Sequence, residues 1–152
     1  MLARFRKAMD EREEGFTLIE LLVVMIIIGI LAAIAIPVFL SQKDKAKTTS
    51  AKSDVSVIGK DVASYYVDGT LPLTLSTTAA GGTWTLKDTA STPVQVDSGK
   101  LSTGNTTLTT AQTITSDAAW CVQVTAGDTA ATIYSYSADK GLKQGACAGS
   151  TN

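Results

Sequence analysis

The sequence contains no histidine and only two cysteines in 152 residues. Histidine is the commonest general base and a common metal ligand, so its absence lowers the expectation of an enzyme or a zinc site. The net charge is −1, from 13 basic and 14 acidic residues, which gives no electrostatic argument for nucleic-acid binding. The sequence shows no phosphate-binding glycine loop and no nucleophile with a base, so it predicts no catalytic residue, no cofactor and no metal.

Proline is scarce as well, and none occurs between Pro37 and Pro72. A helix can therefore continue through this stretch without losing a backbone donor. The length allows one compact domain once the apolar N-terminal region is set aside. Residues 70–132 carry few charges and many threonine, serine, alanine and glycine residues, which is typical of extracellular β structure.

The one long hydrophobic run covers residues 21–40, which include no charged side chain. At a rise of about 1.5 Å per residue, a helix of this length spans about 30 Å, the thickness of a bilayer core. Residues 1–15 form a hydrophilic leader whose basic cluster would keep it in the cytoplasm. The sequence therefore predicts a single membrane-spanning helix.

An ordinary secretory signal is the competing interpretation of this run, because Ala33-Ile34-Ala35 fits an A-x-A cleavage site. The chain would then be a secreted β-rich binding module. Against this, the run is long for a signal and the leader carries acidic residues. Glu20 also stays unexplained, since an ionisable group in an apolar segment costs about 2 to 3 kcal/mol and usually has a partner.

Gly15-Phe16-Thr17-Leu18-Ile19-Glu20, followed by LLVVMIIIGILAAIAIP, resembles the class III signal of type IV prepilins and pseudopilins. The resemblance covers residues 14–40. It implies that a membrane-embedded aspartyl prepilin peptidase cleaves after Gly15 on the cytoplasmic side. The new amine of Phe16 is then N-methylated, and the apolar helix is retained.

Glu20 has a physical role under this resemblance, because cleavage creates a cationic amine on Phe16, four residues earlier and on the same face of a helix. If Glu20 of one subunit meets the Phe16 amine of the next, the pair sets the axial register. Leaving either buried charge unpaired would cost about 3 to 5 kcal/mol. The plainer alternative is a residue at the level of the lipid headgroups.

Gly29 and Ala33 are four residues apart, and small residues at this spacing let apolar helices approach closely. Such residues are also common in membrane helices, so a packing role and plain composition both stay open. Pro37 removes one backbone donor, and with Gly29 it bounds a stretch that can kink or loosen. In the family that the sequence resembles, this stretch often melts during assembly.

An amphipathic pattern continues the helix over residues 41–69. Its apolar positions recur at helical spacing at Ala51, Val55, Ile58 and Val62. We expect the helix to end near Asp68 and Gly69, with Gly69 free to adopt the left-handed conformation. Lys43, Lys45 and Lys47 follow the apolar run, either as a solvated helix face or as contacts to headgroups or other subunits.

Four segments of residues 70–152 alternate between apolar and polar side chains and read as strands: residues 83–87, 93–96, 119–125 and 131–137. A turn at Gly127-Asp128-Thr129 would join the last two into a hairpin. The predicted fold class is α+β. A long N-terminal helix, apolar in one half and amphipathic in the other, carries a small antiparallel β head that packs on the amphipathic half.

Cys121 and Cys147 are expected to form a disulfide, because the chain is interpreted as exported. Closing this loop would stabilise the head by about 3.5 kcal/mol. In pilins that the sequence resembles, such a C-terminal disulfide loop faces outward on the fibre. Asn105-Thr106-Thr107 also fits the N-glycosylation pattern, although chance matches are frequent in a threonine-rich chain.

The expected organisation is a cytoplasmic leader (1–15), a membrane and filament-core helix (16–40), an amphipathic helix (41–69) and a β head (70–152). The expected function is that of a structural, non-enzymatic subunit of a type IV pilus-like filament, anchored in the cytoplasmic membrane before assembly and extracellular afterwards. Its partners would be like subunits, the prepilin peptidase, a membrane assembly platform and lipid. Adhesion, motility or DNA uptake would be properties of the fibre.

A pseudopilin of a type II secretion or competence machine is the nearest alternative, since it would share every N-terminal feature. The pair Cys121 and Cys147 favours a pilin, because pseudopilins often lack the disulfide. An unrelated secreted binding module and an enzyme are the more distant alternatives.

Overall fold

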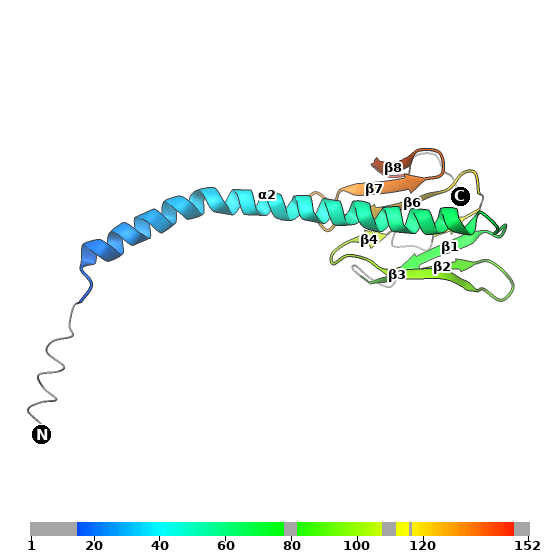
Figure 1. Ribbon diagram of the computed structural model, residues 1–152, viewed down its shortest axis with the longest axis horizontal. Coiled ribbons are helices and arrows are strands. Elements are labelled where there is room, and N and C mark those ends of the chain that lie inside the picture. Colours follow the sequence, from blue (N-terminus) through cyan, green and yellow to red (C-terminus); the bar gives the residue numbers. More distant parts are fainter. Residues whose placement is uncertain (1–14, 78–81, 108–111, 116, 148–152) are drawn as a thin grey trace, which may run out of the picture. The chain divides into compact units, whose positions relative to one another are not determined.

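The computed structural model describes residues 15–77, 82–107, 112–115 and 117–147. Its helix, α2, runs from Leu18 to Tyr65 and contains Pro37 without a break. The chain divides into two compact units between Leu40 and Ser41, and α2 contributes to both (Figure 1). We call residues 18–40 the apolar half of α2 and residues 41–65 the stem.

The head contains two antiparallel sheets in the described residues, where the sequence predicts one. The first has the strand order β3-β2-β1-β5 and consists of β1 (Leu73–Thr77), β2 (Thr83–Asp88), β3 (Gln95–Lys100) and β5 (Gln112–Ile114). The second has the order β4-β6-β7-β8 and consists of β4 (Thr106–Thr107), β6 (Cys121–Thr125), β7 (Ile133–Ser137) and β8 (Gly141–Gln144). The predicted α+β class is confirmed.

The core of the head forms where both sheets pack against the stem. The predicted apolar face is confirmed, since Ala51, Val55, Ile58 and Val62 are all 0% exposed. The first sheet contributes Leu73, Leu75, Trp84, Leu86 and Ile114, the second contributes Val122, Val124 and Tyr134, and Trp120 lies directly before β6. Each large side chain buried in this way contributes about 1.5 to 3 kcal/mol.

The end of α2 differs from the expectation. The helix ends at Tyr65, and Gly69 N–H donates to the Tyr65 carbonyl at 2.7 Å. Gly69 is not in the left-handed region, where the described glycines are Gly104, Gly141 and Gly145. Glycine is instead required here by the Tyr65 ring, because a Cβ on Gly69 would lie 2.5 Å from Tyr65 Cζ.

Three of the four predicted strands lie within one or two residues of the observed bounds, whereas the segment predicted at 93–96 is displaced to Gln95–Lys100. Residues 88–94 are taken up by a turn in which Asp88 Oδ1 accepts from Val94 N–H at 2.8 Å. β3 then runs through Asp97 and Gly99 at the edge of the first sheet. An edge strand pairs on one side only, so its sequence need not show apolar alternation.

The β6–β7 connection is longer than the predicted three-residue turn. Ala126 N–H donates to the Thr132 carbonyl at 2.8 Å, and Asp128 accepts from both Thr132 N–H and Thr132 Oγ1. These hydrogen bonds lower the pKa of the Asp128 carboxyl. Ala131, with φ of 48°, is the residue of this loop in the left-handed region.

Candidate functional site

The N-terminus of α2 carries a capping box made by Thr17 and Glu20. Thr17 N–H and Thr17 Oγ1 both donate to Glu20 Oε2, each at 2.8 Å. Glu20 N–H donates back to Thr17 Oγ1 at 3.3 Å. The backbone N–H groups of Thr17 and Glu20, which have no carbonyl acceptor within the helix, are therefore both hydrogen-bonded.

Thr17 is absent from the site residues that the sequence predicted, although T-x-x-E before an apolar run is itself the signature of a capping box. Phe16 precedes α2 and is 83% exposed. In the uncleaved chain, Phe16 therefore lies outside the helix that carries Glu20, and the helix face that the two residues share after cleavage stays a prediction. The side chain that meets Glu20 is that of Thr17.

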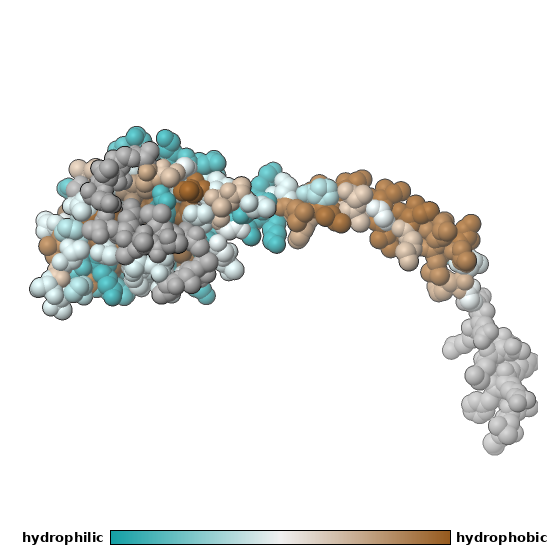
Figure 2. Space-filling model, turned by 180° about the vertical axis from the view of Figure 1, so that it is seen from behind, coloured by the Kyte–Doolittle hydropathy of each residue, from teal (hydrophilic) through white to brown (hydrophobic). Residues whose placement is uncertain are grey.

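The apolar half of α2 is uncovered. Its large hydrophobic side chains range from 47% exposed at Val23 to 79% exposed at Leu18. Figure 2 shows this half as a continuous hydrophobic surface. α2 is the one helix in the described part of the chain that is long and apolar enough to cross a membrane.

Gly29, Ala33 and Pro37 all lie on this uncovered surface. A Cβ on Gly29 would meet nothing within 4 Å, so its backbone is open to a neighbouring helix. Pro37 has no N–H to donate to the carbonyl four residues earlier, which is that of Ala33. Ala33 and Pro37 therefore belong to the same turn of α2, one turn after Gly29.

A buried polar junction ties the head to the stem. Asn105 is 0% exposed, and its Nδ2 donates to Asp54 Oδ2 at 2.7 Å and to Ser50 Oγ at 3.0 Å. Asn105 Oδ1 accepts from Gly127 N–H at 3.1 Å. Asp54 also accepts from Ser102 N–H and Ser102 Oγ, each at 2.9 Å. One amide thus connects the stem, the segment after β3 and the β6–β7 loop.

The β6–β7 loop makes two further bonds to the stem. Lys47 Nζ donates to the Gly127 carbonyl, and Thr129 Oγ1 donates to Asp44 Oδ2 at 2.7 Å. Lys47 is therefore engaged by its own head, whereas the side chains of Lys43 and Lys45 are exposed.

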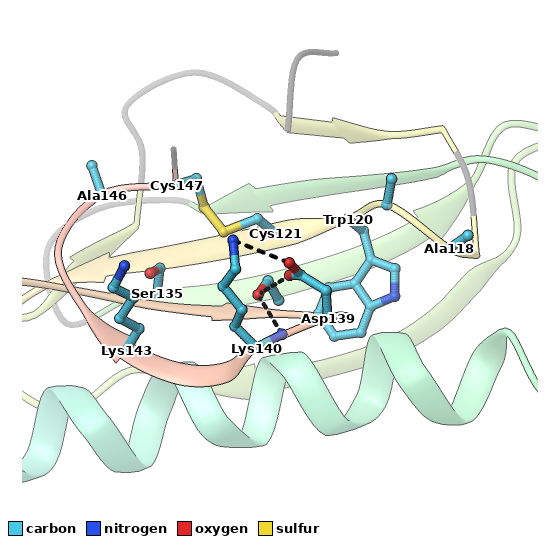
Figure 3. Close-up of a pocket in the computed structure, with 11 residues that line it drawn as sticks. Ala118, Trp120, Cys121, Ser135, Asp139, Lys140, Lys143, Ala146 and Cys147 are labelled. Carbon is cyan, nitrogen blue, oxygen red and sulfur yellow. Dashed lines mark hydrogen bonds and ion pairs between the residues drawn. A yellow bond between two sulfur atoms is a disulfide. The ribbon is translucent and has the colours of Figure 1, made fainter. Parts of the chain in front are cut away.

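Cys121 and Cys147 form a disulfide, and Cys147 N–H donates to Gln123 Oε1 at 3.0 Å. A cavity of about 280 Å³ lies over this bond. Figure 3 shows Lys140 directed toward Asp139 at its rim. Hydrogen bonds from Ser137 and Lys140 lower the pKa of the Asp139 carboxyl. Among the described residues, no three acidic or cysteine side chains cluster closely enough to hold a metal ion.

Comparison with known proteins places the similarity in the N-terminal part of the chain. The family described as the prokaryotic N-terminal methylation motif matches residues 12–36. Type II secretion system core protein G of Pseudomonas aeruginosa is 46% identical over 57 residues, which are 38% of this chain and 40% of that protein. A fimbrial protein of Pseudomonas aeruginosa is also 46% identical over 57 residues, covering 38% of this chain and 37% of its own length.

The type IV major pilin protein PilA of Myxococcus xanthus is 49% identical over 49 residues, which are 32% of this chain and 22% of that protein. The resemblance to prepilins and pseudopilins is thereby confirmed for the N-terminal region. The chain matches 40% or less of the length of each of these three relatives. No solved structure matches the chain.

Proposed function

We propose that this chain is the precursor of a subunit of a type IV pilus-like filament, anchored in a bacterial cytoplasmic membrane before assembly and extracellular afterwards. The observation that carries the proposal is the uncovered apolar half of α2, which begins directly after a methylation-motif junction. Such a surface is unfavourable in water, since each large apolar side chain gains about 1.5 to 3 kcal/mol on burial. Lipid covers it before assembly, and the helices of like subunits cover it afterwards.

Processing takes place at Gly15-Phe16, which lies in exposed, non-helical backbone ahead of α2. Exposed backbone of this kind is where proteases gain access to a folded chain. A prepilin peptidase cleaves after Gly15, and the new amine of Phe16 is methylated. The leader is removed and the apolar helix stays attached to the head. Cleavage of an ordinary secretory signal would remove that helix instead.

Glu20 acts twice in this proposal. Its Oε2 accepts both hydrogen bonds from Thr17, while Oε1 accepts none from any residue that the structure describes. The Phe16 amine of a neighbouring subunit can therefore bind Oε1 without breaking the cap of α2. The pairing opposes assembly out of register, because a buried charge without its partner costs about 3 to 5 kcal/mol.

Gly29, Ala33 and Pro37 serve the packing of the apolar halves. The open backbone at Gly29 and Ala33 allows close approach of a second helix. The Ala33 carbonyl, which Pro37 leaves without a helical donor, makes this turn the easiest one to loosen as subunits insert.

The test is the intact mass and N-terminal sequence of protein sheared from cells of the native host. N-methylated Phe16 in the sheared fraction is the expected result. A first residue of Ile36 would mean an ordinary secreted domain, and an intact leader would mean that no processing occurs. Either result would overturn the proposal.

Two variants separate processing from assembly. Gly15→Leu should leave full-length precursor in the membrane, because a side chain is introduced at the cleavage site. Glu20→Ala should be processed normally and yet give at least about tenfold fewer sheared filaments, because an unpaired buried charge costs about 3 to 5 kcal/mol and a tenfold change represents only about 1.4 kcal/mol. Normal fibres from either variant would contradict the corresponding step.

A pseudopilin of a secretion or competence machine is the second candidate, because the type II secretion system core protein G is among the relatives. Deletion of the gene distinguishes the two functions. Loss of surface filaments with normal protein secretion supports a pilin. Loss of secreted enzymes or of transformation, with surface filaments intact, supports a pseudopilin. In both cases the partners are like subunits, the peptidase and a membrane assembly platform.

A further inference from the structure

A groove of about 320 Å³ lies between the stem and β3. β3 is the edge strand of the first sheet. Its lining includes Asp54, Val57, Asp61, Trp84, Asp97 and Lys100.

The register of β2 and β3 explains why a carboxylate faces this groove. Asp97 lies opposite Leu86 and Gly99 lies opposite Trp84. Directly opposed residues of an antiparallel pair project to the same face of the sheet. Leu86 and Trp84 are buried against the stem, so Asp97 is also directed to the stem side.

The stem supplies the opposite wall at helical spacing. Asp54, Val57 and Asp61 are separated by three and four residues, which places them on one face of α2. Val57 is 48% exposed although it is apolar. The groove therefore combines an uncovered apolar side chain with carboxylates from two elements.

The carboxylates of the groove differ in how well they are satisfied. Asp54 is fully engaged by Ser102 and Asn105. Asp97 accepts one bond, from the adjacent Ser98 N–H at 2.6 Å. Asp61 has no hydrogen bond and no ion pair with any residue in the described ranges. The ion pair found in those ranges joins Lys140 and Asp139.

Burial, and secondly the negative charge of Asp97, raise the pKa of the Asp61 carboxyl. Ionised Asp61 is therefore unfavourable in the isolated head. Trp84 is 2% exposed, and its indole N–H also has no acceptor among the described residues. A half-buried charge and a buried donor that the chain leaves unpaired both indicate a partner from outside.

We propose that this groove binds the stem of a second copy of this chain, with the ammonium of Lys43 or Lys45 placed between Asp61 and Asp97. The proposal rests on the proposed function, because it requires neighbouring subunits. Lys43 and Lys45 directly follow the apolar half of α2, so packing of apolar halves brings them first against neighbouring subunits. Lys47 and Lys52 are already engaged, by the Gly127 carbonyl and the Tyr134 ring.

No lysine in the described part of the same chain pairs with these carboxylates. Lys100 lines the groove but makes no ion pair in the described ranges. Lys43 lies 18 residues before Asp61 on one continuous helix, a distance of about 27 Å, which no lysine side chain spans. Two residues turn a helix by about 200°, so Lys43 and Lys45 point to opposite sides of the stem. A neighbouring groove on either of these two sides therefore meets one of the two lysines.

Charge reversal tests the groove in the native host, with the ratio of sheared filament to processed membrane subunit as the readout. The double variant Asp61→Lys, Asp97→Lys should lower this ratio about tenfold or more. Adding Lys43→Glu or Lys45→Glu to that variant reverses the charge of the partner lysine as well. One of these two additions should restore the filaments. Two substitutions outside the groove are the matched controls. Asp68→Lys should leave the ratio unchanged, and Lys143→Glu added to the double variant should not restore filaments.

A crosslink tests the contact directly. Asp61→Cys combined with Lys43→Cys or with Lys45→Cys should give a ladder of covalent multimers on a non-reducing gel, for one of the two combinations, from the filaments that still form. Asp61→Cys alone should give none. Folding is checked separately, because Asp61→Asn should melt no lower than the wild type and still assemble less well.

The outcomes separate this proposal from the proposed function. Absence of sheared filaments from the wild type would contradict the proposed function itself. A different set of results would overturn only the groove contact. In it, the wild type forms normal filaments, the double charge reversal does not lower their amount, and neither cysteine combination gives crosslinks. Asp97 would then be an inward charge that protects an edge strand from pairing with other chains.

Discussion

The two halves of α2 share one continuous backbone and have opposite surroundings. In the stem, Ala51, Val55, Ile58 and Val62 are completely buried by the two sheets. In the apolar half, which is the more hydrophobic of the two, no large side chain in the described region is less than 47% exposed. The hydrophobicity of a helical segment therefore does not by itself determine whether the sheets of the head bury it. The stem is apolar on one face only, whereas the other half is apolar all round, as expected for a helix that lipid or several neighbours surround.

Truncating one isoleucine in each half should give the largest contrast. Ile58 is 0% exposed and Ile28 is 59% exposed. Ile58→Ala should destabilise the head by about 2 to 5 kcal/mol, because it leaves a cavity in the core. Ile28→Ala should leave the melting temperature of the full chain in detergent unchanged and reduce only filament yield. Equal losses of stability in thermal melts would remove the distinction between the halves.

Loss of the buried amide should be the next largest effect. Asn105→Ala removes three hydrogen bonds and leaves Asp54 and Gly127 N–H less satisfied. We expect about 2 to 3 kcal/mol of destabilisation in urea unfolding. Thr103→Ala, at a nearby exposed position, is the control and should change stability by less than about 0.5 kcal/mol. A loss as small as that of the control would mean that water replaces the junction.

The two helical glycines give a contrast of opposite sign. A Cβ on Gly59 would lie 2.6 Å from Tyr136 Cγ, whereas one on Gly29 would meet nothing. Gly59→Ala should destabilise the head by about 1 to 3 kcal/mol through overpacking. Gly29→Ala should raise the helix stability of the detergent-solubilised chain by up to about 1 kcal/mol. If Gly29→Ala also leaves filament yield unchanged, close helix approach at Gly29 is excluded.

The capping box should matter locally. Thr17→Ala removes a cap worth about 1 kcal/mol, and Thr17→Ser keeps the hydroxyl. Hydrogen exchange should therefore accelerate at the amides of the first turn in the alanine variant and not in the serine variant. The melting temperature of the head should not change in either. A drop in head stability would show that the two halves are coupled.

The smallest effect should come from Asp61, and it depends on pH. Because its pKa is raised in the folded head, the stability linked to its protonated form is present at low pH and lost as the pH rises through the folded pKa. Asp61→Asn should therefore melt about 1 to 3 °C higher than the wild type at pH 7. The difference should vanish below about pH 4, the range in which aspartate is protonated in both states. A difference that is constant with pH would contradict an unfavourable charge.

The sequence predicts α2 and its buried face well because both depend on local periodicity. β2, β6 and β7 were predictable for the same reason, since each alternates around buried residues such as Trp84 and Val122. The segment LTLST of β1 alternates in the same way around Leu73 and Leu75 and was missed, whereas GLKQ of β8 is a strand because β7 pairs with it. One sheet was therefore predicted where the described residues form two.

The candidate site was predictable only in part. The motif at Gly15, Phe16 and Glu20 is contiguous and can be read from the sequence, and Thr17 could have been read in the same way. The contacts of Asp54 with Ser102 and Asn105 join residues 48 and 51 positions apart, and no local pattern encodes them. The same holds for Asp61 and Asp97, which are brought together by packing an edge strand against the stem.

The buried position of Asn105 has a consequence for when this residue could be modified. The triplet Asn105-Thr106-Thr107 carries the N-glycosylation pattern, and the nitrogen that would receive the sugar is Nδ2. In the folded head this nitrogen already donates to Ser50 and Asp54, with no exposed surface on the residue. A transferase could reach it only while the chain is still unfolded, and an attached glycan would then prevent the junction from closing. Folding itself thus protects this asparagine from modification.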